Sequence, residues 1–144
     1  MLSATAVPAR TGVSLTLICT VICGCQKISD TGQALADTKY RLRTWGEQIR
    51  SCHSAGVAIE KSRSFEEAIG YLEDRKIINS NEARRMHDDA WGNSFHWYTE
   101  PTETGTIVRI ASSGREAGAT ADQLMIEIEV PHEASSEVKI KYSW

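Results

Sequence analysis

Apolar residues recur every three or four positions between residues 35 and 52, a spacing that predicts an amphipathic helix. The stripe consists of Leu35, Thr38, Leu42, Trp45, Ile49 and Cys52. Asp30 or Thr31 is a suitable N-cap, because their side chains can accept hydrogen bonds from free backbone N–H groups. We expect the helix to end near Gly56 and to pack its apolar stripe on a sheet.

A second, shorter helix is predicted from Ser64. Ser64 and Glu67 have the spacing of a capping box, in which each side chain bonds a backbone N–H of the first turn. Its expected buried face is Phe65, Ala68, Ile69 and Leu72. Ile77 and Ile78 should then enter the core, and Asn79-Ser80 can cap a short helical turn that runs through Met86.

After residue 94 the period changes from about 3.6 to two, which predicts strands. The expected strands cover residues 95–99, 106–111, 124–130 and 138–142, with Glu127 and Glu129 facing Lys139 and Lys141 across the last hairpin. The predicted fold class is α+β: a long N-terminal helix plus a short helix, packed on an antiparallel sheet of about four strands.

The stretch Asp88–Phe95, here called the corner, lies where the period changes. The Asp89 carboxylate can hold a turn by bonding nearby backbone N–H groups. Gly92 allows a positive φ, and Asn93 tolerates the same region. Trp91 should be largely buried between the first helix and the sheet, with a partner for its indole N–H.

The first residues have the pattern of a secretory leader. Arg10 precedes an apolar run, Val13–Cys23, that is too short to span a bilayer as a helix. The run ends in Ile22-Cys23-Gly24-Cys25, which is similar to a bacterial lipobox, and this resemblance implies a lipid on Cys25. An uncleaved anchor and a cleaved signal without lipid are the alternatives. In the lipid-anchored form Cys52 is the one unmodified cysteine, and we expect it to pack as a small hydrophobe.

Composition changes this picture little. The 144 residues, with a formal charge of −3, suit one ordinary globular domain. No cluster of Lys and Arg stands out, which argues against a nucleic-acid partner. We therefore expect a signal peptide of the lipoprotein type at residues 1–24, a linker at 25–33 and a globular domain at 34–144.

The motif Asp89-x-Trp91-Gly92-Asn93-x-Phe95 resembles a signature of the major pseudopilin of type II secretion, the GspG type. A second signature of that family is similar to Ser112-Ser113-Gly114-Arg115-Glu116-Ala117-Gly118, followed by Thr120-Ala121-Asp122-Gln123-Leu124. The resemblance covers residues 30 to 130 and implies a pseudopilin-like globular domain. The family's Gly–Phe cleavage point and long apolar helix have no match here, so fibre assembly is not implied.

In the pseudopilin family the second signature binds calcium, which implies Ser112, Glu116 and Asp122 as ligands here. Calcium takes six to eight oxygen ligands. Gln123 replaces the second acid of the family pattern, so we expect weak calcium binding or none. A solvated loop closed by glycines is the alternative that we favour.

Other chemistry has weaker signals. The four histidines, His53, His87, His96 and His132, do not have metal-ligand spacing. His87-Asp88-Asp89 could form one edge of a metal site, although a turn role explains Asp89 more simply. Trp45, Trp91 and Trp97 stand where core anchors are needed, with a sugar-binding platform as the alternative. No cofactor and no catalytic pair emerges, so an enzyme is not expected.

Two functions remain. The first is a non-catalytic protein of the bacterial cell envelope, anchored in the membrane by lipid and facing the periplasm. It would have a structural or interaction role in protein secretion, with other envelope or secretion proteins as partners. The second is a small-ligand or calcium-binding lipoprotein that uses the loop from Ser112 to Asp122.

Overall fold

The computed structural model describes residues 15–115 and 124–144, and for residues 15–30 it describes the backbone alone. The elements follow in the order α1 (Leu15–Ser54), the 3-10 helix η1 (Ile59–Lys61), α2 (Phe65–Asp74), α3 (Ser80–His87), β1 (His96–Pro101), β2 (Gly105–Ser112), β3 (Leu124–Pro131) and β4 (Lys139–Ser143). The chain divides into two units at Gln33, and the second unit, residues 34–144, contains the sheet.

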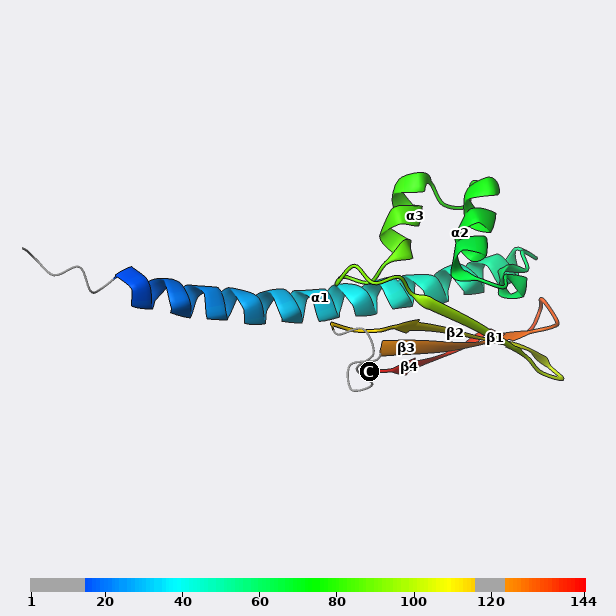
Figure 1. Ribbon diagram of the computed structural model, residues 1–144. Helices are drawn as coiled ribbons and strands as arrows, with labels where there is room; N and C mark the ends of the chain where they lie inside the picture. Colours follow the sequence, from blue (N-terminus) through cyan, green and yellow to red (C-terminus); the bar gives the residue numbers. More distant parts are fainter. Residues whose placement is uncertain (1–14, 116–123) are drawn as a thin grey trace, which may run out of the picture. The chain divides into compact units, whose positions relative to one another are not determined.

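The second unit has the predicted α+β class, with helices on a four-stranded antiparallel sheet. The strand order is β1-β2-β3-β4, so each strand pairs with its neighbour in sequence. Figure 1 shows the sheet on one side of the C-terminal part of α1, with α2 and α3 on the other side. Antiparallel pairing lets each strand return beside the one before it, so every neighbour in the sheet is also a neighbour in the chain.

The start of α1 differs from the prediction. The helix begins at Leu15, so Asp30 and Thr31 lie inside it instead of capping it, and residues 25–33, expected as a linker, are helical. Capping preferences are a weak signal when no proline interrupts the pattern, and a glycine such as Gly32 lowers helix stability without ending the helix. Among the described residues, no helix is both long enough and apolar enough to cross a membrane.

The apolar stripe of α1 packs as predicted from Thr38 onward. Thr38, Leu42, Trp45, Ile49 and Cys52 are buried, whereas Leu35 is 37% exposed and lies outside the core. The helix ends at Ser54, and Gly56 follows with a φ of +71°, the left-handed conformation common after helix ends. The stripe therefore marks the part of α1 that packs in the core, against both the short helices and the sheet.

Cys52 is a free, buried cysteine. Burial raises the pKa of its thiol, and the nearby charge of Glu60 raises it further. A protonated, enclosed thiol is a poor nucleophile. Cys52 thus packs as a small hydrophobe, as the sequence predicted.

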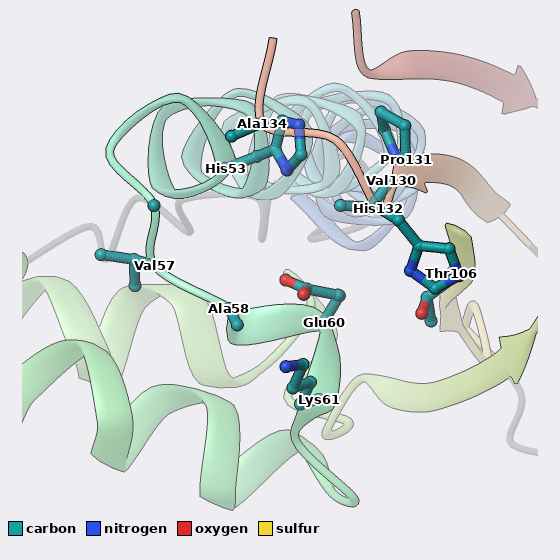
Figure 2. A pocket seen from close by; sticks show the side chains of 11 residues that line it. His53, Val57, Ala58, Glu60, Lys61, Thr106, Val130, Pro131, His132 and Ala134 are labelled. Carbon is teal, nitrogen blue, oxygen red and sulfur yellow. The ribbon is translucent and has the colours of Figure 1, made fainter. Parts of the chain in front are cut away.

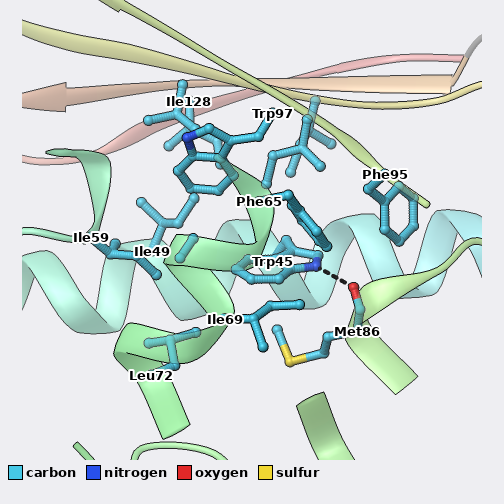
Figure 3. Packing of buried hydrophobic residues seen from close by; sticks show 14 of the residues in the cluster. Trp45, Ile49, Ile59, Phe65, Ile69, Leu72, Met86, Phe95, Trp97 and Ile128 are labelled. Atoms are coloured by element: carbon cyan, nitrogen blue, oxygen red, sulfur yellow. Dashed lines mark hydrogen bonds between the residues drawn. The ribbon is translucent and has the colours of Figure 1, made fainter. Parts of the chain in front are cut away.

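Aromatic rings form the centre of the core (Figure 3). The Phe65 ring lies 4.8 Å from Trp45 and 6.2 Å from Trp97, measured between centroids. The buried indole N–H of Trp45 donates to the Met86 carbonyl at 2.9 Å, and that of Trp97 donates to the Ser62 carbonyl at 3.0 Å. These two bonds connect α1 to the end of α3, and β1 to the segment before α2.

The short helices α2 and α3 both begin with side-chain caps. Ser64 accepts the Glu67 N–H as predicted, but Glu67 returns a bond to the Arg63 N–H, so the box at α2 is incomplete. Asn79 and Glu82 form a complete capping box at α3. The predicted face of α2 is buried, and Ile78 enters the core whereas Ile77 is 37% exposed.

The sheet has one core face and one polar face. The core face of β3 is Leu124, Ile126, Ile128 and Val130, all buried as predicted. On the other face Glu127 pairs with Lys141 and Glu129 with Lys139 across the β3–β4 register, which confirms the expected cross-strand pairs.

Candidate functional site

The carboxylate of Asp89 organises the corner. Asp89 is 2% exposed, and its Oδ1 accepts the backbone N–H groups of Trp91 and Asn93, both at 2.9 Å. The Asp89 N–H donates to the Asn93 carbonyl at 2.8 Å, and Gly92 has a φ of +85°. The predicted turn role of Asp89 and the predicted positive φ of Gly92 are confirmed.

The same carboxylate binds the end of β2. The Ser112 hydroxyl donates to Asp89 Oδ2 at 2.6 Å and accepts the Gly114 N–H at 3.0 Å. The Asn93 side-chain amide donates to the Gly114 carbonyl at 2.9 Å. We call these four residues, Asp89, Asn93, Ser112 and Gly114, the corner–loop junction, because they join the corner to the loop after β2.

Helix α1 holds the backbone of the corner. The Arg41 guanidinium donates to the carbonyls of Asp88 at 2.6 Å and Asp89 at 3.3 Å. The Ala90 N–H donates to the Thr38 hydroxyl at 3.0 Å, and Thr38 is fully buried. Sequence reasoning placed Thr38 on the apolar stripe and gave no role to Arg41, because these bonds join residues 47 to 52 positions apart in the chain.

Trp91 differs from its expected role. It is partly buried and packs against the edge of the core cluster, whereas Trp45 and Trp97 lie inside that cluster. In the described part of the chain no residue accepts a hydrogen bond from the Trp91 indole, although such a partner was expected. In this turn the backbone N–H of Trp91 donates to the Asp89 carboxylate, and the indole ring lies at the edge of the core.

The expected calcium ligands are only partly placed. Ser112 is buried in the corner–loop junction, where its hydroxyl already donates to Asp89 and accepts from Gly114. Glu116 and Asp122 lie outside the described residues. Within residues 15–115 and 124–144, no group of three His, Cys, Asp or Glu side chains is placed to hold a metal ion.

Two histidines near the corner make side-chain contacts. His87 Nδ1 lies 2.6 Å from Asp88 Oδ1, and the Ser94 hydroxyl donates to the same oxygen at 3.0 Å. His96 Nε2 lies 2.9 Å from the Ser113 hydroxyl on the exposed face of the sheet. A hydroxyl beside an imidazole has the two groups of a nucleophile–base pair, whose base is normally oriented by a third group. No carboxylate among the described residues orients the His96 ring, so the pair lacks its third group.

A cavity of about 260 Å³ opens beside the end of α1 (Figure 2). Its polar lining includes His53, Glu60, Lys61, Thr106 and His132. His53 is 8% exposed, and its Nε2 has no hydrogen-bond partner among the described residues. Sequence reasoning missed this site because its residues come from distant parts of the chain and share no motif.

Comparison of the chain with protein-family models, curated proteins and solved structures found no match. The resemblance to the pseudopilin family therefore stays a prediction that rests on the motif residues.

Proposed function

We propose that this chain is a non-catalytic protein of the bacterial cell envelope with a structural or interaction role in protein secretion. It is held at the membrane by a lipid on Cys25 and faces the periplasm. The observation that carries the proposal is the corner–loop junction. Asp89 and Asn93, which belong to the motif that resembles the pseudopilin signature, form hydrogen bonds in this junction, and Gly92 of the same motif forms the turn of the corner.

The hydrogen bonds of the junction support a structural role over a catalytic one. Asp89 is buried, and both of its carboxylate oxygens accept bonds from the protein itself. A general base needs an oxygen that can reach a substrate proton. A carboxylate that is enclosed and already bonded at both oxygens stabilises the corner and leaves no oxygen for chemistry.

The second candidate is a small-ligand or calcium-binding lipoprotein. The cavity in Figure 2 supports the small-ligand form, because His53 on its wall has a buried imidazole nitrogen with no hydrogen-bond partner among the described residues. The calcium form rests on the loop that contains Glu116 and Asp122, outside the described residues. For the calcium form, Ser112 would have to coordinate the ion while it keeps its bonds to Asp89 and Gly114.

Processing of the N-terminus tests the envelope assignment. The full chain is expressed in a Gram-negative host with labelled palmitate, and the mature N-terminus is determined by mass spectrometry. We expect cleavage before Cys25, label in the protein and recovery with membranes. Cys25→Ser should lose the label, whereas the matched variant Cys23→Ser should keep it. An intact leader or an unmodified Cys25 would disprove the lipid anchor.

The secretion role has its own test. The gene is deleted in the source bacterium, and the extracellular proteins are compared by quantitative mass spectrometry. We expect a defined set of extracellular proteins to decrease and to return when the wild-type gene is restored. An unchanged set of extracellular proteins would contradict a role in secretion while leaving the lipid anchor intact.

A further inference from the structure

Strand β4 has a free edge. In the sheet β1-β2-β3-β4, the residues Lys139–Ser143 pair with β3 on one side, and no described strand lies on the other. Edge strands present backbone N–H and C=O groups that a further strand can pair with. The edge is five residues long, which is near the usual length of a strand.

Cations flank this edge on both faces of the sheet. Ile140 contacts Gly46 of α1, so the even-numbered residues of β4 face the helix and the odd-numbered ones face away. Lys139 and Lys141 therefore lie on the face away from α1, with side chains 74% and 82% exposed. Their ammonium groups are 3.7 Å and 3.5 Å from glutamates of β3 and remain open to solvent.

The helix side of the edge combines cations with aromatic rings. The Lys39 ammonium lies 5.7 Å from the Trp144 ring centroid. The Arg43 guanidinium lies 5.9 Å from the Tyr142 ring and 5.5 Å from the Trp144 ring. Tyr142 is 43% exposed and Trp144 is 40% exposed. Neither Lys39 nor Arg43 forms an ion pair with another described residue, and both cations lie beside exposed aromatic rings.

We propose that β4 with Lys39, Arg43, Lys139 and Lys141, here called the basic edge, binds an extended acidic segment of a partner protein by strand addition. Side chains of an added strand point alternately to the two faces of a sheet. Cations on both faces match acidic side chains at neighbouring positions, whereas a flat lipid surface would meet one face. The inference rests on the proposed interaction role and names the chemistry of the partner.

Lysines on an edge strand can also serve to prevent pairing with other chains. That role explains Lys139 and Lys141, which project from the strand itself. It does not explain Lys39 and Arg43, which come from α1 and lie over exposed rings. A purely protective edge would bind no strand, and the experiment below separates the two roles.

The test measures binding of a fluorescent peptide that alternates Glu and Val to the full chain in zwitterionic detergent. Hydrogen exchange of β4 is followed in the same samples. A peptide that alternates Glu and Pro is the charge-matched control, because proline cannot donate to a ladder. We expect the Glu-Val peptide to bind. Binding should slow amide hydrogen exchange in β4 by at least about threefold, the order expected when a strand edge gains weak hydrogen-bonded pairing, and should leave the exchange rate of β1 unchanged.

Charge reversal locates the site. Lys39→Glu with Arg43→Glu should weaken peptide binding at least about tenfold, the effect expected for placing like charges at an interface. The control, Arg84→Glu with Arg85→Glu on the exposed side of α3, changes the net charge equally and should bind as wild type. Circular dichroism and thermal unfolding check that both double variants are folded.

Three outcomes would overturn the proposal. Absence of binding, or equal loss in both double variants, would reduce the basic edge to a protective or non-specific surface. Equal binding of the Glu-Pro peptide would show ionic contact without strand addition. Slower β4 exchange with phosphatidylglycerol micelles but not with the peptide would identify the occupant as an anionic membrane. The palmitate and secretion tests are unaffected by these results, so failure of this inference and failure of the proposed function are distinguishable.

Discussion

At the scale of single residues, the Asp89 carboxylate shows how much a local motif can specify. Its bonds to Trp91 and Asn93 lie within five residues and follow from the turn itself. Its bond to Ser112 connects two elements and depends on how β2 is placed. The residue therefore serves both the local turn and the tertiary contact.

A double-mutant cycle tests this junction. Asp89→Asn and Ser112→Ala should each lower the free energy of unfolding by about 1–3 kcal/mol, because each leaves a buried polar group without a partner. The double variant should cost less than the sum, with a coupling of about 0.5–3 kcal/mol. Urea denaturation measures the cycle, and Asp74→Asn at the exposed end of α2 is the control. Strict additivity would show that the two side chains do not act together.

The tryptophans give a second prediction at this scale. Trp45 is fully buried, so Trp45→Ala should cost about 3–5 kcal/mol, the range for deleting a large buried aromatic. Trp91 lies at the margin of the core, so Trp91→Ala should cost about 1–2 kcal/mol. Chemical denaturation of the two variants side by side measures the difference. Equal costs would mean that Trp91 is as central as its motif suggested.

At the scale of elements, the polar face of the sheet has a network of charges across its four strands. Arg109 of β2 donates to Glu100 of β1 at 2.8 Å and to Glu127 of β3 at 2.9 Å. Lys141 of β4 donates to Glu127 at 3.5 Å. Exposed ion pairs contribute little singly, but here Arg109 and Glu127 are each shared between two partners. The network favours the observed register on the face that has no hydrophobic layer.

This network should give acid sensitivity. The hydrogen bond from Arg109 lowers the pKa of the Glu127 carboxyl from its ordinary 4.5; partial burial opposes this effect and Lys141 adds to it. A carboxyl with a lowered folded pKa stabilises the fold above its ordinary pKa, and that stabilisation is lost as pH falls through the folded value. The stability difference between wild type and Glu127→Gln should therefore shrink from about pH 7 to about pH 3.

Denaturant midpoints across this pH range measure the effect. Glu133→Gln is the matched control, because Glu133 is exposed and forms no ion pair with another described residue. The stability difference between wild type and Glu133→Gln should not shrink as the pH falls, in contrast to that of Glu127→Gln. If the stability difference between wild type and Glu127→Gln is the same at every pH, the Arg109–Glu127 hydrogen bond does not form in solution.

At the scale of the whole molecule, the loop after β2 can be held in place by hydrogen bonds within the protein or by a bound calcium ion. At the start of this loop, which the structure describes, Ser112 and Gly114 are joined to Asp89 and Asn93 by direct hydrogen bonds. These hydrogen bonds within the protein anchor the start of the loop.

Calcium should accordingly have little effect on stability. We expect a thermal shift of less than about 2 °C at millimolar calcium, with magnesium as the control, since a ligand stabilises only in proportion to its occupancy. The loss of an acidic group at Gln123 is the physical reason. A stoichiometric ion with a large shift would show that Glu116 and Asp122 form a competent site.

Local spacing alone determined much of this protein. The stripe from Thr38 to Cys52 and the alternation in β3 follow from the periods of helix and strand, which hold wherever the element packs. The turn at Asp89 and the positive φ at Gly92 follow from side-chain and backbone chemistry within a few residues. The pairing of Glu127 with Lys141 followed because a short hairpin constrains which residues can face each other.

Tertiary structure decided the rest, because it depends on contacts that no short window contains. It placed Trp45 and Trp97, rather than Trp91, at the centre of the core. It brought Ser112 to Asp89 and Arg41 to the backbone of the corner. It also placed Lys39 and Arg43 beside the free edge of β4. Each of these contacts joins residues from different elements, and their distances are set by how the helix and the sheet pack.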